Sequence, residues 1–513
     1  MDAGIPGTAH RRGLMLMAAA AGASLAMPGP LMAAARCGGG DLSDVKAAID
    51  KQRPEAIKRL QDWIALPSIA AEGLNAQEGA QYMAELLKDA GFQQTTIIQT
   101  DGRPGVFATM DNGSPRSVGM YLMYDVKQFD PSEWSSPPLE ARIVDRPGLG
   151  KVMIGRGAVN QKGPEASFLA GLHGLRAAGR KPPVNIVLIA EGEEEIASPH
   201  FPQLVRRPEV LSALGKCREV WMPFASQTPK GSVEVDLGAK GVIEVELVCS
   251  TKAWGRGAEN DIHSSYKAEL DSAVWRLVKA LSTLVSEDGN DPAIDDWFEN
   301  VQPLTARQKE LIAEQAANTS EAERKKFLGV QTWVRDLPYR QALERLASQP
   351  TVNIEGMYAG YTGPGGKTIL PSKAVAKLDL RLVPNQTADE AERKLKAHLA
   401  RRGYGDISVT RTGGYDPTQT DETSPVIQSA LEVYRKGGLE VGMSPRLAGS
   451  WPGYIFTGPP VNLPAAHFGF GHGAHQHAPD EYYVIEAENP KLRGMAGASL
   501  GYVEFLYALA ARS

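Results

Sequence analysis

The sequence predicts an α/β protein in which a smaller α+β domain interrupts a larger one. In the first half of the chain, segments with helical spacing of apolar residues alternate with short strand-like segments, which is typical of a sheet flanked by helices. Residues 184–190 form a continuous apolar run, as expected of a strand covered on both faces. Between residues 242 and 413 strands and helices alternate again, which indicates a small domain of ferredoxin-like type.

The larger domain is predicted to begin at residue 43, and its first part runs to residue 241. Val45, Ile49 and Leu60 recur at near-helical spacing in the first segment, and Gly91 marks the end of the second helix. The predicted helices cover 43–65, 76–90 and 163–178, and the predicted strands cover 95–100, 105–110, 118–124 and 184–190.

The inserted domain is predicted over 242–413, and the larger domain resumes over 414–513. A charged, largely helical stretch at 287–350 is expected to be an insertion within the smaller domain. The remaining predicted elements are strands at 242–250 and 375–383 and helices at 270–286, 387–402, 424–437 and 489–511.

Residues 1–36 are predicted to be an export signal. Arg11 and Arg12 precede an apolar run from Met15 to Ala26, and small residues follow at 33–35. This order is typical of an export signal, and the paired arginines favour the twin-arginine route. The run is too short to span a bilayer. We therefore expect a periplasmic or secreted protein that does not contact a membrane once the signal is removed. A disordered leader, or lipidation at Cys37, is the alternative.

Composition excludes several classes of partner. The formal charge of −5 and the pI of about 6.1 argue against binding to nucleic acid or to an anionic membrane. Only three cysteines occur, so the sequence does not contain a disulfide framework.

Several short motifs carry the functional prediction. The central one, at 155–164, reads GRGAVNQKGP; it follows YLMYDV at 121–126 and precedes EGEEEIASP at 191–199. Further motifs are WSSPPLE at 134–140, DIHS at 261–264, DLRLVP at 379–384, GSWP at 449–452 and HAPDEY at 477–482. Together and in this order they resemble the M20 family of metallopeptidases, and its carnosinase-like dipeptidases in particular.

The resemblance implies a fold and a set of roles. The fold would be a mixed-sheet, zinc-exopeptidase-like catalytic domain interrupted by a lid domain that often dimerises. By resemblance, Glu194 would be the general base and Asp125 would orient a metal ligand. His263 would stabilise the oxyanion, and Glu195 and His477 would bind metal. The substrate carboxylate or backbone would be bound by Arg381, Asn353, Gly449 and Ser450.

Three positions depart from the family pattern. Met123 stands where a histidine ligand is expected, and Asn160 stands where a carboxylate would bridge two metal ions. The segment 220–230, where a further aspartate is expected, contains no acidic residue. A thioether is a poor zinc ligand, and a neutral amide cannot balance the charge of two cations. We therefore expect at most one zinc or other divalent ion, or no metal at all. His472 and His475 are either replacement ligands or solvated histidines of a loop.

The sequence leaves several functional hypotheses open. The first is an exported M20-like peptidase or amidohydrolase that acts on small peptides or N-acyl amino acids through a degenerate or remodelled metal site. The second is a metal-free enzyme that uses the crowded glutamates at 191–195 for acid/base chemistry, as in cyclisation or isomerisation. The third is a peptide-binding pseudoenzyme. Purely structural roles also stay open for Asp125, His263 and Arg381. A homodimer formed through the lid domain is expected from the resemblance alone.

Overall fold

The structure, a computed structural model, describes residues 40–512. The predicted export signal at 1–36 and Cys37 lie outside the described residues. Within the described part of the chain, no helix is both long and apolar enough to cross a membrane.

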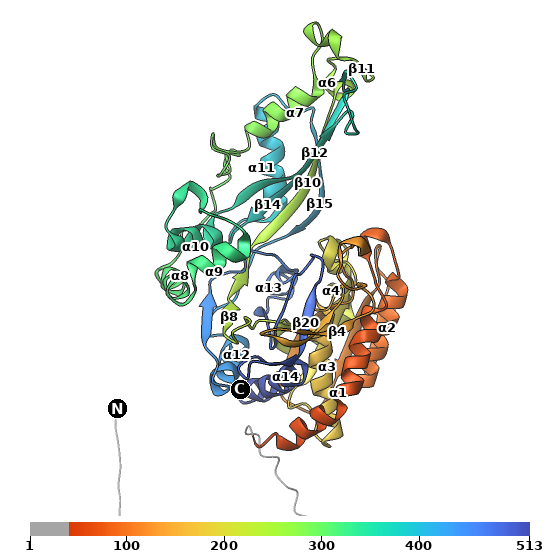
Figure 1. Cartoon of the computed structure of the whole chain (residues 1–513), viewed down its shortest axis with the longest axis vertical. Coiled ribbons are helices and arrows are strands. Elements are labelled where there is room, and N and C mark those ends of the chain that lie inside the picture. Colours follow the sequence, from red (N-terminus) through yellow and green to blue (C-terminus); the bar gives the residue numbers. More distant parts are fainter. Residues whose placement is uncertain (1–39, 513) are drawn as a thin grey trace, which may run out of the picture. The chain divides into compact units, whose positions relative to one another are not determined.

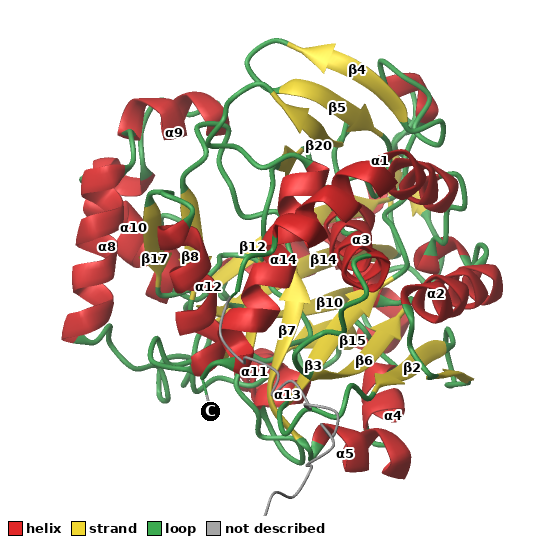
Figure 2. Cartoon of the chain, turned by 90° about the horizontal axis from the view of Figure 1, so that it is seen from below, coloured by secondary structure: helices red, strands yellow, loops and turns green. Residues whose placement is uncertain are grey.

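A six-stranded mixed sheet forms the centre of the larger domain (Figure 2). The middle strands pair in parallel, whereas the strands at one edge pair antiparallel. In sheet order the strands are β1 (Gln94–Ile98), β2 (Gly105–Met110), β6 (Asn185–Glu191), β3 (Ser117–Met123), β7 (Cys217–Pro223) and β18 (Ala465–Phe468). The four strands predicted between residues 95 and 190 are confirmed to within about two residues. The structure adds β7 and β18.

Helices cover both faces of this sheet, which explains the continuous apolar run in β6. Helices α1, α3 and α14 gather on one side of the strands (Figure 2) and contribute to the main apolar core. The helices of this side are α1 (Ser43–Ile64), α2 (Ala76–Ala90), α3 (Lys162–Ala177), α12 (Pro425–Lys436) and α14 (Met495–Ala510). A second apolar cluster lies on the opposite face under α4 (Phe201–Val205), α5 (Pro208–Leu214) and α13 (Tyr454–Thr457).

The predicted helix at 489–511 begins later than expected. Pro490 and Gly494 precede its first turn, and Gly494 takes the extended N-cap position of α14. Neither residue favours a helix interior, so the chain remains in a turn until Met495.

A smaller antiparallel sheet brings the two central motifs together. Its strands, in sheet order, are β19 (Gly473–Ala474), β20 (Tyr482–Ala487), β5 (Gly150–Ile154) and β4 (Arg142–Arg146). Because β20 pairs with β5, the HAPDEY motif before β20 lies beside the GRGAVNQKGP motif after β5. No strand was predicted in these segments.

The inserted domain is a four-stranded antiparallel sheet covered on one face by two helices (Figure 1). In chain order it contains β10 (Gly241–Ser250), α7 (Ala273–Ser282), β12 (Thr351–Ala359), β14 (Lys373–Leu382), α11 (Ala388–Arg401) and β15 (Ser408–Tyr415). The sheet order is β12-β14-β10-β15. This is the predicted ferredoxin-like arrangement, with β12 and β15 added and α7 shorter than the predicted helix at 270–286.

Between α7 and β12 lies the helical insertion predicted at 287–350. It contains α8 (Ala306–Asn318), α9 (Glu321–Leu328) and α10 (Tyr339–Ser348). Helix α8 packs against β17 (Val441–Ser444), which pairs in parallel with β8 (Val233–Asp236) in the larger domain. The remaining short elements are α6 (Thr251–Trp254), β9 (Gly238–Ala239), β11 (Ile262–His263), β13 (Ile369–Leu370) and β16 (Thr418–Gln419).

Candidate functional site

Asp125 organises the loop that carries two of the predicted site residues. It lies just after β3, is almost fully buried, and accepts hydrogen bonds from the backbone N–H groups of Glu194 (3.2 Å) and Glu195 (3.0 Å). Burial and the neighbouring Glu195 charge raise the pKa of Asp125 to about 8. The carboxyl group thus fixes the turn after β6, where both glutamates project from the end of the sheet.

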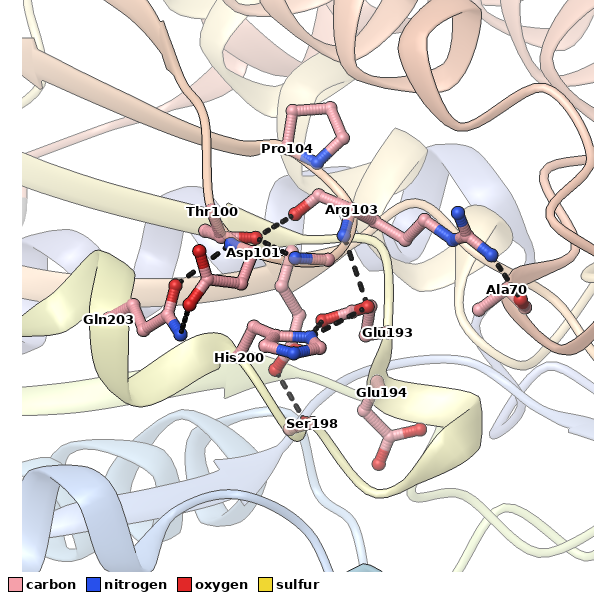
Figure 3. Close-up of polar contacts among 12 residues, drawn as sticks. Ala70, Thr100, Asp101, Arg103, Pro104, Glu193, Glu194, Ser198, His200 and Gln203 are labelled. Atoms are coloured by element: carbon pink, nitrogen blue, oxygen red, sulfur yellow. Dashed lines mark hydrogen bonds and ion pairs between the residues drawn. The ribbon is translucent and has the colours of Figure 1, made fainter.

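Two glutamates of the acidic run have structural partners. Glu193 contacts His200 Nδ1 (2.9 Å) and accepts a hydrogen bond from the backbone N–H of Arg103 (3.0 Å), as Figure 3 shows. Glu191 is buried and accepts hydrogen bonds from the hydroxyl groups of Tyr121 (2.8 Å) and Ser198 (2.7 Å). These two carboxylates hold neighbouring segments together.

Glu194 differs from the other members of the run. Its side chain is directed away from Glu193 (Figure 3) and is half-buried. Within residues 40–512, its carboxylate makes no hydrogen bond or ion pair. Burial, followed by the charges of Glu195, Asp125 and Glu191, raises the pKa of Glu194 well above its ordinary value. A raised pKa of this kind is expected of a carboxyl group that accepts and releases protons.

Glu195 is the centre of a compact polar cluster. Its Oε1 atom accepts a hydrogen bond from the Asn160 side-chain amide (2.7 Å), and its Oε2 atom lies 3.1 Å from His477 Nε2. Asn160 Nδ2 also lies 3.2 Å from His477 Nε2. The side chain of Glu195 is 4% exposed, whereas that of His477 is 53% exposed. The three side chains thus meet near the protein surface, with the Glu195 carboxylate buried and the His477 ring exposed.

Glu481 shapes the loop that presents Asn160. Its buried carboxylate accepts hydrogen bonds from the backbone N–H groups of Gly157 (3.0 Å), Val159 (2.9 Å) and Asn160 (2.8 Å). Arg156 Nη1 donates a further bond at 2.7 Å. Burial raises the pKa of Glu481, while these donors act in the opposite direction. The loop is therefore wrapped around one anion.

The lid domain contacts the site loop directly at the end of β15. The Tyr415 hydroxyl donates to the Glu194 carbonyl oxygen (2.9 Å) and lies 2.9 Å from Ser198 Oγ. Gly413 allows this close approach, because a Cβ at that position would lie 2.5 Å from the Cβ of Ala197. The loop that bears Glu194 is thus held by both domains.

Two predicted substrate-binding residues also meet across the domains. Arg381, near the end of β14, donates to Ser450 Oγ (3.2 Å) and forms an ion pair with Asp379 (2.6 Å). Gly449 precedes Ser450 in the same loop. Asn353 lies on the neighbouring strand β12, opposite Asp379, and is exposed. The structure therefore groups Arg381 with Ser450 and leaves Asn353 farther along the lid surface.

Three predicted histidines lie apart from the Glu195 cluster. His263 is exposed in β11 and hydrogen-bonds to Ser265 Oγ (2.8 Å) within the lid. His472 is buried, with one ring nitrogen against the Gln227 carbonyl (2.7 Å) and the other against the Tyr482 hydroxyl (3.0 Å). His475 contacts the Pro479 carbonyl. Because both nitrogens of His472 are engaged, the geometry does not support its predicted role as a replacement ligand.

Sequence reasoning missed Lys127 and Tyr415. Lys127 follows Asp125 by two residues, and its ammonium group lies 3.6 Å from Glu195 Oε2 and also donates to the Glu195 carbonyl oxygen. The signal that could have indicated Lys127 is a cation immediately beyond an acidic motif. Tyr415 has no comparable signal, because its contact with Glu194 joins segments more than two hundred residues apart.

Comparison with known proteins identifies relatives of both domains. Residues 237–406 match the M20 domain family described as "Peptidase dimerisation domain". The Cys-Gly metallodipeptidase of Schizosaccharomyces pombe is 25% identical over 377 residues, which cover 70% of this chain and 76% of that protein. The human Beta-Ala-His dipeptidase is 26% identical over 406 residues, which cover 73% of this chain and 76% of that protein.

A solved structure shows a closer likeness. The M20 family metallo-carboxypeptidase of Sulfolobus solfataricus superimposes with a TM-score of 0.78 at 30% sequence identity, covering 89% of this chain and 99% of that chain. The protein therefore belongs to the M20 family of metallopeptidases, a family of hydrolases.

The family implies divalent metal ions, and the described side chains can be compared with the expected ligand positions. The Met123 side chain is buried in the apolar cluster beneath α4 and α5. Asn160 donates to Glu195 through its amide and brings no negative charge. The segment 220–230, where a further aspartate is expected, contains no acidic residue. Among residues 40–512, no group of three or more His, Cys, Asp or Glu side chains could hold a metal ion.

We predict that Glu481→Gln strongly destabilises the protein. The change leaves the Arg156 guanidinium buried without an anion and places an amide against three N–H donors, so the expected loss is about 3 kcal/mol or more. Urea unfolding measures the loss. Glu486→Gln, near the end of β20, removes only surface ion pairs with Lys151 (3.0 Å) and Arg53 (3.5 Å) and should cost no more than about 1 kcal/mol. Equal losses in the two variants would contradict the role assigned to Glu481.

Proposed function

We propose that the protein hydrolyses an amide bond in a small peptide or N-acyl amino acid with a free carboxylate. The observation that carries this proposal is the half-buried Glu194 carboxylate, which has no protein partner among the described residues. In the proposed step, Glu194 takes a proton from a water molecule whose oxygen attacks the carbonyl carbon. The proton then passes to the leaving nitrogen as the carbon–nitrogen bond breaks.

The proposed substrate class rests on two further observations. Arg381 and Ser450 place a guanidinium and a hydroxyl together where the lid meets the larger domain, and this pair suits a terminal carboxylate. The relatives are named as a Cys-Gly metallodipeptidase and a Beta-Ala-His dipeptidase, so short peptides are the substrates to test first. We also propose that the metal centre is degenerate, because Met123 and Asn160 occupy two ligand positions.

We predict that Glu194→Gln lowers kcat by at least about 100-fold, because the amide cannot accept the proton. The purified protein would be incubated with dipeptides, N-acyl amino acids and their carboxamide analogues, and products measured by mass spectrometry.

The carboxamides should be poor substrates. Arg381→Lys should raise KM about tenfold and reduce this discrimination, since a lysine cannot form the forked contact.

Arg411→Lys is the matched control on β15, where the native arginine forms an ion pair with Asp389 on the lid. The Arg411→Lys variant should leave both kcat and KM unchanged. Tight binding of the same ligands without turnover would replace the hydrolase proposal with a peptide-binding role. Full activity of Glu194→Gln would exclude Glu194 as the group that transfers the proton.

We propose that the chain forms a homodimer through the lid domain. The match to a peptidase dimerisation domain supports this, and so does β12, an edge strand that exposes Ile354, Met357 and Tyr358. We predict that Ile354→Asp combined with Tyr358→Asp shifts the protein from dimer to monomer in analytical ultracentrifugation. Phe327→Asp, on the insertion helix α9, should leave the dimer intact. A wild-type monomer at micromolar concentration would overturn the proposal.

We propose that residues 1–36 direct export, which supports a periplasmic or secreted location. The support is the Arg11-Arg12 pair ahead of the apolar run. We predict that replacing both arginines with lysine retains the full chain in the cytoplasm of a bacterium that has twin-arginine export. Cell fractionation measures this, with Arg36→Lys as the control. Unchanged export of the double variant would contradict the twin-arginine route.

A further inference from the structure

The Lys127 ammonium group lies where the buried carboxylates of the site need a positive charge. It lies 3.6 Å from Glu195 Oε2 and donates a hydrogen bond to the Glu195 carbonyl oxygen. The Lys127 side chain is 34% exposed, whereas that of Glu195 is 4% exposed. The contact therefore joins a cation at the protein surface to an anion in the interior.

The carboxyl groups around this contact are crowded. Asp125, Glu191 and Glu195 are all buried within one small region at the end of the sheet, and Glu194 lies beside them. Buried carboxylates persist only with compensating charge or hydrogen bonds, so a cation at this place has a physical function.

The Glu195 carboxylate already has three nitrogen neighbours. Asn160 Nδ2 contacts one oxygen at 2.7 Å, and His477 Nε2 and Lys127 Nζ approach the other at 3.1 and 3.6 Å. A protonated amine cannot be a metal ligand, and it repels a divalent cation placed at the same carboxylate. The two arrangements therefore compete for Glu195.

We propose that the Lys127 ammonium group balances the negative charge of Glu195 and thereby opposes the binding of a divalent metal ion to that carboxylate. The inference rests on the site described under the proposed function, but it does not depend on hydrolysis. Lys127 acts through Glu194 and Glu195 and is therefore a positioning residue.

Asn160→Asp offers a direct test in the full-length protein. Because the Asn160 amide already contacts both Glu195 and His477, an aspartate at this position would complete three potential zinc ligands, which is the number that a catalytic zinc site requires. The comparison is between Asn160→Asp alone and Asn160→Asp combined with Lys127→Gln. Each protein is treated with chelator, dialysed and titrated with zinc chloride by calorimetry.

We predict that Lys127→Gln raises zinc affinity at least tenfold in the Asn160→Asp background. Lys151→Gln in the same background removes a lysine on β5 that pairs with Glu486, and it should change the affinity less than twofold. Lys127→Arg keeps the charge and should keep zinc affinity low, which separates charge from folding defects if the glutamine variant is unstable. The wild type should contain no zinc after growth in zinc-supplemented medium.

Two results would overturn the inference. One is wild-type protein that retains one or more equivalents of zinc through purification. The other is an unchanged zinc affinity when Lys127→Gln is added to Asn160→Asp. Neither result depends on substrate turnover. A wild-type protein that contains zinc and hydrolyses peptides would reject this role of Lys127 and leave the hydrolase proposal intact. A wild-type protein that is free of metal and inactive would reject the hydrolase proposal and leave this role of Lys127 intact.

Discussion

The geometry of the site depends on one buried anion, Glu481. Three loop N–H groups and the Arg156 guanidinium converge on its carboxylate, so that the backbone from Gly157 to Asn160 is wrapped around a single charge. Such a loop has no regular hydrogen-bonding pattern of its own, and its buried N–H groups need a partner. Glu481 supplies that partner and places the Asn160 side chain against Glu195.

Asp125 anchors the turn after β6, just as Glu481 anchors the loop from Gly157 to Asn160. By accepting the N–H groups of Glu194 and Glu195, it fixes the turn at which the two side chains separate. Glu195 is directed inward to Asn160 and His477, while Glu194 is left without a protein partner in the described part of the chain. The division of roles between two adjacent glutamates thus follows from backbone anchoring.

The lid contributes to the same turn through Tyr415 and to ligand recognition through Arg381. Tyr415 reaches the Glu194 carbonyl from the end of β15, and Arg381 reaches Ser450 from the end of β14. Movement of the lid would therefore change both the support of the proposed proton acceptor and the proposed carboxylate contact. Coupling of this kind is expected where a site lies at the junction of two domains.

The sequence by itself determined the fold class and the principal strands β1, β2, β3 and β6, and it drew attention to the Glu191–Glu195 run, because local periodicity and motif order carry this information. It did not reveal β5 and β20, whose pairing joins segments over three hundred residues apart, or β4, which pairs with β5 across a short turn. Nor could it show that Lys127 contacts Glu195, that His472 is engaged on both nitrogens, or that Tyr415 supports Glu194. Those facts were decided by the tertiary structure alone, because they depend on which distant side chains share a buried space and must satisfy one another's charges and hydrogen bonds.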